Sequence, residues 1–260
     1  MQARTLSLLV LFAGGTRSVG AQAPFVTDDA SLAPHRTWHV EVYEQFASLG
    51  MLDRPALRQH TLVLSVMRGV LPGLEVGVDI PLLHIENSGV DNAFGLGDLN
   101  VVAKFRFRDA DSTGWFPAVY GSVQVEAPTG DPSQQLGTGE VDAVVTLIAE
   151  RTLASGLVLR GNLGAVLLGN SLTGVVGLQR SGTILVTSGA VGIPVHPRFL
   201  LLLEGSFAQA HYTDDRDRET RLQVGGWWRM GARSQLGIAY QRGWQATPPH
   251  QVQVGWSVDF

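Results

Sequence analysis

The chain has 260 residues, of which only 16% are charged, against roughly 25% in an average soluble protein. It contains no cysteine, which excludes a disulfide framework, a thiolate nucleophile and cysteine-based metal sites. Its net charge of −4 predicts no polyanionic partner such as a nucleic acid. The 31 glycines are compatible with an exported β-barrel, where glycine relieves crowding as strands bend.

The N-terminus has the three parts of a secretory signal peptide. A short basic region ends at Arg4, an apolar stretch follows over residues 5–13, and small residues at 19–21 form a cleavage site. A cut after Ala23 also satisfies the small-residue rule but would place Pro24 beside the broken bond, and glycines disfavour a buried N-terminal helix. We therefore predict a signal peptide over 1–21 and a mature barrel over 22–260, which begins with a periplasmic or lumenal segment, 22–36.

No later apolar run approaches the ~18 residues that a spanning helix needs. The longest runs from Phe199 to Leu203 and has the length of a strand. Any membrane span in the mature chain must therefore be a β-strand.

Polar and apolar residues alternate over most of the mature chain, so successive side chains would lie on opposite faces of strands. Between Leu99 and Phe107 the odd positions are apolar, whereas Lys104, Arg106 and Arg108 share the other face. Three cations on one face suit a water-filled lumen and not a soluble core. The expected strands are 37–47, 59–69, 74–80, 98–108, 119–127, 142–153, 157–168, 183–194, 199–209, 221–230, 235–241 and 251–260.

The connections between these strands alternate in length. Tight connections with Gly or Pro follow the second, sixth, eighth and tenth strands, and the connection after the fourth, 109–114, is intermediate. Longer polar connections lie around 49–58, 84–96, 129–140, 169–182 and 210–218. An outer-membrane barrel has short periplasmic turns and long outer loops. The sequence thus predicts an all-β fold, a transmembrane antiparallel up-and-down barrel of about twelve strands with both termini in the periplasm.

The last ten residues alternate without interruption. Trp256, Val258 and Phe260 share the apolar face, and Gln251 and Gln253 share the polar one. A final strand that ends on an aromatic residue is typical of outer-membrane barrels, and we expect Trp256, Val258 and Phe260 to act as the assembly signal.

Short motifs resemble a known family. They are Pro24-Phe25-Val26-Thr27-Asp28-Asp29-Ala30, Trp38 to Glu41, Gly95 to Asp98 with Lys104 to Phe107, Ala127 to Asp131 with Gly137 to Gly139 and Asp142, and the terminal Phe260. Together they resemble the phenol meta-cleavage-pathway (MetA-pathway) family of outer-membrane transporters, although Phe105 stands where that family often has Tyr. The resemblance implies a barrel that passes hydrophobic or aromatic compounds, and an N-terminal motif at Thr27, Asp28 and Asp29.

Charged residues on the predicted inner faces are the candidate site. They are Glu75, Asp79, Asp98, Lys104, Arg106, Arg108, Glu126, Glu150, Arg160, Arg221 and Arg229. A charge at the bilayer midplane costs about 2–4 kcal/mol, so these side chains must face water or each other. We expect pairing across a narrow lumen to be their commonest role.

The sequence favours a passive channel in the bacterial outer membrane for small hydrophobic or aromatic solutes. An outer-membrane enzyme such as a phospholipase is the alternative, but no strand sets a serine and a histidine together with an orienting group, so we predict no enzymatic activity, cofactor or metal. A structural barrel is the third possibility, favoured if the segment around Asp28 and Asp29 seals the lumen. The expected partners are membrane lipid, lipopolysaccharide, the barrel-assembly machinery and a small solute, with no nucleic acid.

Overall fold

The computed structural model describes residues 24–48, 56–87, 91–111, 115–167, 182–209, 219–245 and 249–260. The predicted signal peptide, 1–21, lies outside the described residues. Within these ranges, no helix is long and apolar enough to cross a membrane.

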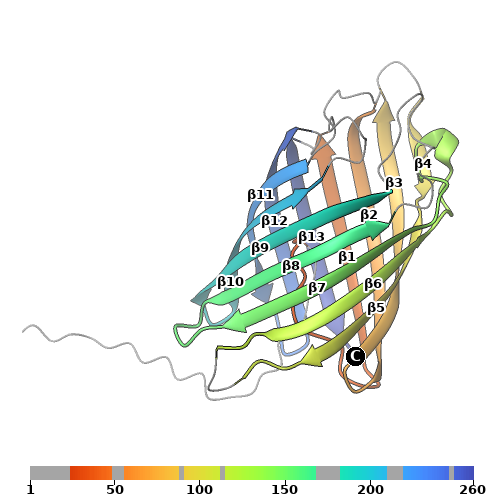
Figure 1. Ribbon diagram of the computed structural model, residues 1–260. Coiled ribbons are helices and arrows are strands. Elements are labelled where there is room, and N and C mark those ends of the chain that lie inside the picture. The colour runs from red at the N-terminus through yellow and green to blue at the C-terminus, as the bar shows by residue number, and fades with distance from the viewer. Residues whose placement is uncertain are drawn as a thin grey trace, which may run out of the picture.

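Antiparallel strands make up almost all of the described chain (Figure 1). The strands are β1 (Trp38–Ser48), β2 (Ala56–Leu71), β3 (Leu74–Asn87), β4 (Ala93–Leu96), β5 (Leu99–Arg108), β6 (Ala118–Ala127), β7 (Asp142–Thr152), β8 (Val158–Leu167), β9 (Thr183–His196), β10 (Phe199–Ala208), β11 (Glu219–Arg229), β12 (Ser234–Gln245) and β13 (His250–Asp259). One short 3₁₀ helix, η1 (Pro132–Gln134), lies between β6 and β7.

The sheet closes on itself. Neighbouring strands pair in chain order, β1 pairs with β13, and β2 pairs with both β1 and β3. The short β4 and the longer β5 pair with the same strand, β3, at different heights, so they act as one interrupted strand. The fold is therefore a closed antiparallel barrel of twelve strands, which confirms the predicted all-β up-and-down barrel and its strand count.

One predicted connection is wrong in part. Residues 84–96 were expected to form a loop, but β3 continues to Asn87 and β4 returns beside it. Ile85 and Ala93 are buried together with Leu136, which comes from the connection between β6 and β7. This packing joins residues far apart in the sequence, so local alternation could not reveal it.

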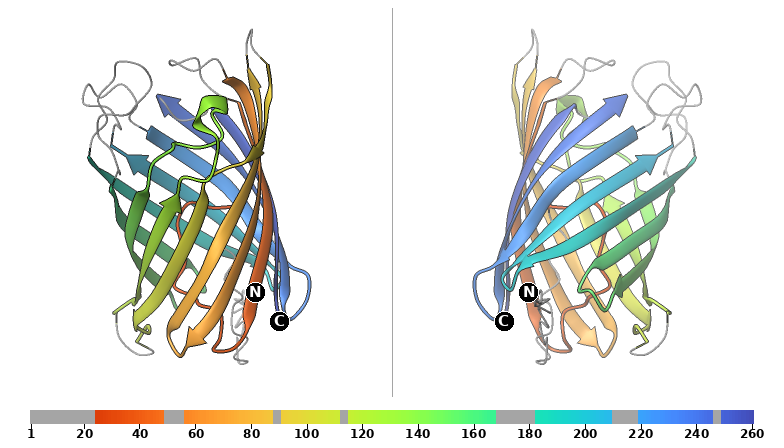
Figure 2. Two further views of the ribbon diagram at one scale, coloured as in Figure 1. Left: turned by 90° about the vertical axis from the view of Figure 1, so that its right-hand side faces the viewer. Right: turned by 90° about the vertical axis from the view of Figure 1, so that its left-hand side faces the viewer.

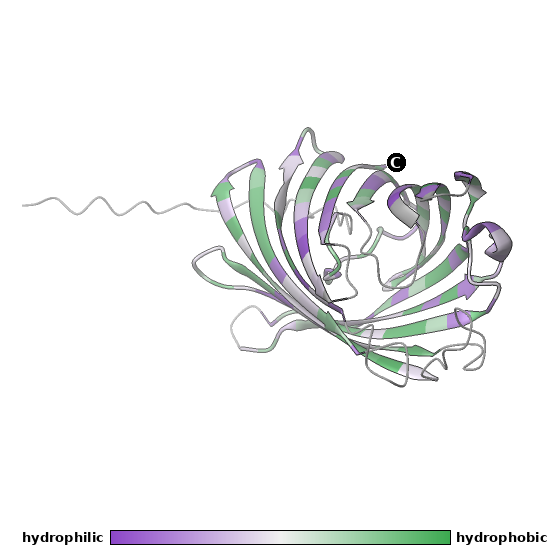
Figure 3. Ribbon diagram, turned by 90° about the horizontal axis from the view of Figure 1, so that it is seen from above, coloured by the Kyte–Doolittle hydropathy of each residue, from purple (hydrophilic) through white to green (hydrophobic). Residues whose placement is uncertain are grey.

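The two faces of the wall differ as the alternation predicts. In β13, Val254 and Trp256 are 43% and 42% exposed, whereas Gln253 and Ser257 are 5% and 1% exposed. Figure 3 looks along the barrel and shows the strands as a ring of alternating hydrophilic and hydrophobic positions. An apolar outer surface around a polar interior is the arrangement of bacterial outer-membrane barrels.

The two ends of the barrel carry different connections. The turn end has the short ones, such as Pro72–Gly73 and Pro197–Arg198, and the C-terminus lies there (Figure 2). The loop end has longer ones, such as residues 128–141 between β6 and β7. This alternation is the one predicted from the spacing of the strands.

An outward row of rings crosses several strands near the loop end. Phe46 lies opposite His60, His60 opposite His84, and His84 opposite Phe94 in the strand registers. Adjacent ring centroids lie 4.8, 6.0 and 6.4 Å apart. Such girdles are typical of membrane interfaces. Phe46 and Phe94 thus lie near the loop end of the barrel.

The terminal residue joins the last strand to the first through its backbone. The Phe260 N–H donates to the Trp38 carbonyl at 2.9 Å, while the Phe260 side chain is 64% exposed. Because Phe260→Ala keeps the backbone bond and removes an exposed ring, we expect the refolded variant to keep its stability to within about 0.5 kcal/mol. If the ring serves the assembly machinery, insertion of the same variant in cells should fall several-fold. Heat-modifiable migration of membrane fractions measures this, and normal insertion would exclude the role.

Candidate functional site

The inner segment, residues 24–36, lies inside the barrel and follows its wall (Figure 2). At its start, the Pro24 carbonyl accepts a hydrogen bond from Gln223 of β11, and the Val26 and Thr27 N–H groups donate to Glu204 of β10. In its middle, Asp28 and Asp29 pair with Lys104 of β5. At its end, the Ala33 N–H donates to Glu75 of β3 and the Arg36 N–H donates to the Gly69 carbonyl of β2. These strands are distributed around the ring. Only a segment within the lumen can contact them all.

An apolar contact fixes the start of the inner segment. The Phe25 ring lies 4.7 Å from the Trp227 ring, centroid to centroid. Both belong to a buried cluster with Ala190, Leu202 and Ala239, which are inward residues of β9, β10 and β12. Burial of these side chains holds the segment to one side of the wall, because their removal from water is favourable.

Charged groups fix the middle of the inner segment. The Lys104 side chain is 1% exposed, and its ammonium nitrogen lies 2.7 Å from Asp28 and 3.3 Å from Asp29. Arg160 lies 3.7 Å from Asp29 and 2.7 Å from Glu150. Burial alone would raise the pKa of Asp29, but Lys104, Arg160 and a hydrogen bond from Ser31 outweigh it and hold that pKa below its ordinary value. The cluster is thus a buried network of alternating charges.

Close backbone contact fixes the end of the inner segment. A Cβ atom at Gly69 of β2 would lie 2.1 Å from the Pro34 carbonyl oxygen and 2.4 Å from that of Ala33. Any larger residue at position 69 would push the segment off the wall. The glycine is therefore required by this approach.

Four predicted lumen residues serve this arrangement. Glu75, Lys104, Glu150 and Arg160 lie on β3, β5, β7 and β8, and all contact the inner segment or a group bound to it. The predicted N-terminal motif supplies the other half, since Thr27 is 1% exposed and Asp28 and Asp29 carry the ion pairs. The predicted pairing of lumenal charges thus runs through the inner segment.

The other predicted lumen residues have separate partners. Asp79 accepts a hydrogen bond from Ser65, and Glu126 lies 3.5 Å from Thr138. Arg106 pairs with Asp109 at 3.2 Å, and Arg221 pairs with Glu219. Arg108 lies over the Phe116 ring at 4.6 Å, and Arg229 is exposed at the turn end.

Asp98 anchors a loop. Its carboxylate accepts hydrogen bonds from the Gly130 N–H at 2.8 Å and the Thr138 N–H at 2.6 Å. The Thr129 hydroxyl donates to the Gly97 carbonyl at 2.9 Å. Two motifs noted in the sequence, Gly95 to Asp98 and Ala127 to Asp131, therefore form one structure, which we call the Asp98 clasp.

Two cavities lie on either side of the inner segment. The turn-end cavity, of about 520 Å³, is lined by residues 30–34 of the segment and by His39, Glu41 and Tyr120. The loop-end cavity, of about 330 Å³, is lined by Phe25, Val26 and Asp28 of the segment and by polar residues such as Ser122, Thr146 and Ser188. The segment therefore narrows the interior between two spaces large enough for small molecules.

Several interior residues were not predicted from the sequence. Glu204 is 4% exposed and accepts hydrogen bonds from two backbone N–H groups of the inner segment. It follows an apolar run without alternation, so the sequence does not show which face of the strand is the inner one. His39 and Glu41 point inward from β1, where the alternation with Val40 and Val42 could have identified them.

Comparison with solved structures shows the same fold. The crystal structure of the COG4313 outer membrane channel from Pseudomonas putida F1 is similar with a TM-score of 0.70 and 16% identity, over 89% of this chain and 98% of that one. The NanC porin has a TM-score of 0.58 and 11% identity, over 85% and 98% of the two chains. The KdgM porin has a TM-score of 0.57 and 8% identity, over 85% and 99%.

At the level of sequence, residues 60–257 match the model of the family described as "Putative MetA-pathway of phenol degradation". None of the curated proteins compared matches the chain.

Proposed function

Since this chain belongs to the family of the MetA pathway of phenol degradation, we propose that it is a passive outer-membrane channel for small hydrophobic or aromatic solutes. The observation that carries the proposal is the interior of the barrel. Two cavities, of about 520 and 330 Å³, lie on either side of the inner segment within a closed wall whose outer surface is apolar. The family description supports aromatic compounds as the solute class.

The orientation and partners follow from the same proposal. The turn end, with the C-terminus and the beginning of β1, faces the periplasm, and the loop end faces outward. Lipid contacts the apolar wall, and lipopolysaccharide contacts the ring row and the cations near the loop end, such as Arg58 and Arg242. Glu75, Lys104, Glu150 and Arg160, which contact the inner segment or a group bound to it, line the path beside that segment.

Planar-bilayer recording tests the channel. The purified mature protein should give discrete conductance steps, and aromatic solutes should reduce the current in a saturable manner because they occupy the narrow interior. Heat-modifiable migration on a gel is the control for folding. A folded barrel that gives neither conductance nor altered solute uptake on deletion of its gene would exclude a channel.

A structural barrel without transport is the second candidate, because the inner segment contacts strands on most sides of the lumen. The same recording distinguishes the two, since a sealed barrel carries no current. An enzyme is disfavoured on geometric grounds. His39 and Asp259 form a carboxylate–histidine pair at 2.7 Å, but a hydrolase also needs a nucleophile bonded to the second ring nitrogen, and in the described chain no group is bonded to it.

A further inference from the structure

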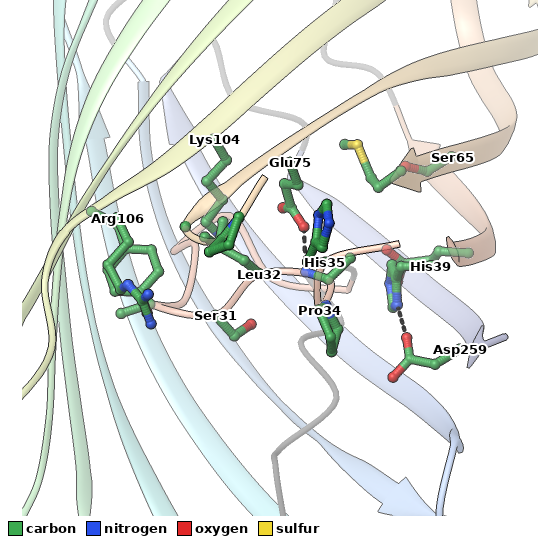
Figure 4. Close-up of a pocket in the computed structure, with 17 residues that line it drawn as sticks. Ser31, Leu32, Pro34, His35, His39, Ser65, Glu75, Lys104, Arg106 and Asp259 are labelled. Atoms are coloured by element: carbon green, nitrogen blue, oxygen red, sulfur yellow. Dashed lines mark hydrogen bonds and ion pairs between the residues drawn. The ribbon is translucent and has the colours of Figure 1, made fainter. Parts of the chain in front are cut away.

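The turn-end cavity contains an oriented histidine. His39 of β1 lies directly opposite Asp259 of β13, and its Nδ1 atom is 2.7 Å from the Asp259 carboxylate (Figure 4). A carboxylate only accepts hydrogen bonds, so Nδ1 carries a proton and donates it. This contact fixes the plane of the ring between the first and last strands.

The other ring nitrogen has no partner. The His39 side chain is 9% exposed, and its Nε2 atom is buried without a hydrogen bond to any described residue. Buried polar atoms in folded proteins are almost always hydrogen-bonded, so an exception on the wall of a cavity indicates a place for a ligand. His39 lines the turn-end cavity.

We propose that His39, oriented by Asp259, is the polar anchor of a solute subsite that hydrogen-bonds the hydroxyl group of a small neutral molecule with an apolar body. The inference rests on the proposed channel function and adds to it a site and a chemical class. The cavity of about 520 Å³ has ample room, since an apolar cavity of about 150 Å³ holds a benzene molecule. Leu32, Pro34 and Met67 line it and supply apolar contacts for the body of the solute.

The charges around the cavity select the polar group. Asp259, Glu41 and Glu75 face it as acids, while the cations are Arg106, paired with Asp109, and Lys104, already bound to Asp28 and Asp29. Three carboxylates disfavour an anionic solute, because like charges at short range repel. A hydroxyl group both donates and accepts, so it can pair with Nε2 of His39 whether the ring is neutral or protonated.

Nuclear magnetic resonance of the histidine rings tests binding directly. The full mature protein is labelled with ¹⁵N-histidine and titrated with benzyl alcohol, or with toluene as the probe without a hydroxyl. Benzyl alcohol should shift the Nε2 resonance of one ring in a saturable manner, and that resonance should be missing from the His39→Gln spectrum. The absence of a shift, or an equal shift with toluene, overturns the proposal.

Current block measures the contribution of the hydrogen bond. His39→Leu should raise the half-blocking concentration of benzyl alcohol about fivefold to tenfold and leave that of toluene unchanged, because one net hydrogen bond is lost. His84→Leu is the matched control, since His84 stacks on His60 and meets the Phe94 ring edge-on in the outward row. If His39→Leu fails the heat-modifiability test, His39→Gln, which keeps a hydrogen-bonding group, should give a smaller rise. An unchanged half-blocking concentration of benzyl alcohol in both variants overturns the subsite. If the wild-type barrel carries no current, the channel is overturned, and the resonance titration alone tests the subsite.

Discussion

Lys104→Met should release the inner segment from the wall and raise the conductance of the barrel several-fold. Methionine keeps most of the length of the side chain and removes the charge that lies 2.7 Å from Asp28 and 3.3 Å from Asp29. Two buried carboxylates would then share only Arg160, which lies 3.7 Å from Asp29. Removing one partner of a buried ion pair costs about 3–5 kcal/mol because the remaining charge is uncompensated.

That cost should be relieved locally. The barrel wall is held by backbone ladders that do not involve Lys104's side chain, whereas the inner segment can leave the wall and return Asp28 and Asp29 to water. We therefore expect the variant to keep its heat-modifiable migration while residues 24–36 become accessible to protease. Single-channel recording and mass spectrometry of the cleavage products measure the two effects.

Arg106→Met is the matched control for the loss of a cation. Arg106 lies two residues along β5, but its side chain is 39% exposed and pairs with Asp109 instead of the inner segment. Gly69→Ala provides an independent route, since its Cβ would meet the Pro34 carbonyl at 2.1 Å, and Gly161→Ala, with open space around it, is the control. A Lys104→Met barrel with wild-type conductance and a protected segment would show that the ion pairs do not hold the segment.

Alternation predicts the strands of the barrel wall well because the polar and apolar residues within one strand are enough to assign its two faces. In β13 the lipid face and the lumen face are both continuous, so Val254 and Gln253 could be assigned without knowledge of any partner. The same holds for Lys104 in β5, whose place on the inner face follows from its neighbours Ala103 and Phe105. Strand count and loop alternation follow from the same local signal.

The inner segment could not be traced in this way. Thr27, Asp28 and Asp29 were recognised as a motif, but Lys104 is 76 residues from Asp28 and Glu204 is 177 residues from Thr27. No local period connects such positions. Residues 24–36 also form no ladder of their own apart from one bridge at His35, so their place in the lumen depends on individual contacts with the wall. The β4 strand was missed for a related reason, since its burial depends on Leu136.

Asp98→Ala should free the loop at residues 128–141 while the rest of the barrel stays folded. The Asp98 carboxylate is buried and accepts hydrogen bonds from the Gly130 and Thr138 N–H groups, at 2.8 and 2.6 Å. Alanine leaves both donors without this acceptor, and hydrogen bonds to a charged group contribute about 1.5–3 kcal/mol each. The packing of Leu136 on Ile85 and Ala93 would remain, so the loop should open more often without losing its position entirely.

Limited proteolysis measures this opening. Cleavage within residues 128–141 should become more than about tenfold faster in Asp98→Ala, because a rise of about 1.4 kcal/mol in the free energy of the closed loop already gives a factor of ten. Asp131→Ala is the matched control in the same loop, since its carboxylate caps η1 through Ser133 and Gln134 while exposed to solvent. Its effect should be much smaller. Equal cleavage rates in both variants would mean that the packing of Leu136 holds the loop. The Asp98 clasp would then only fix the break between β4 and β5 at Gly97.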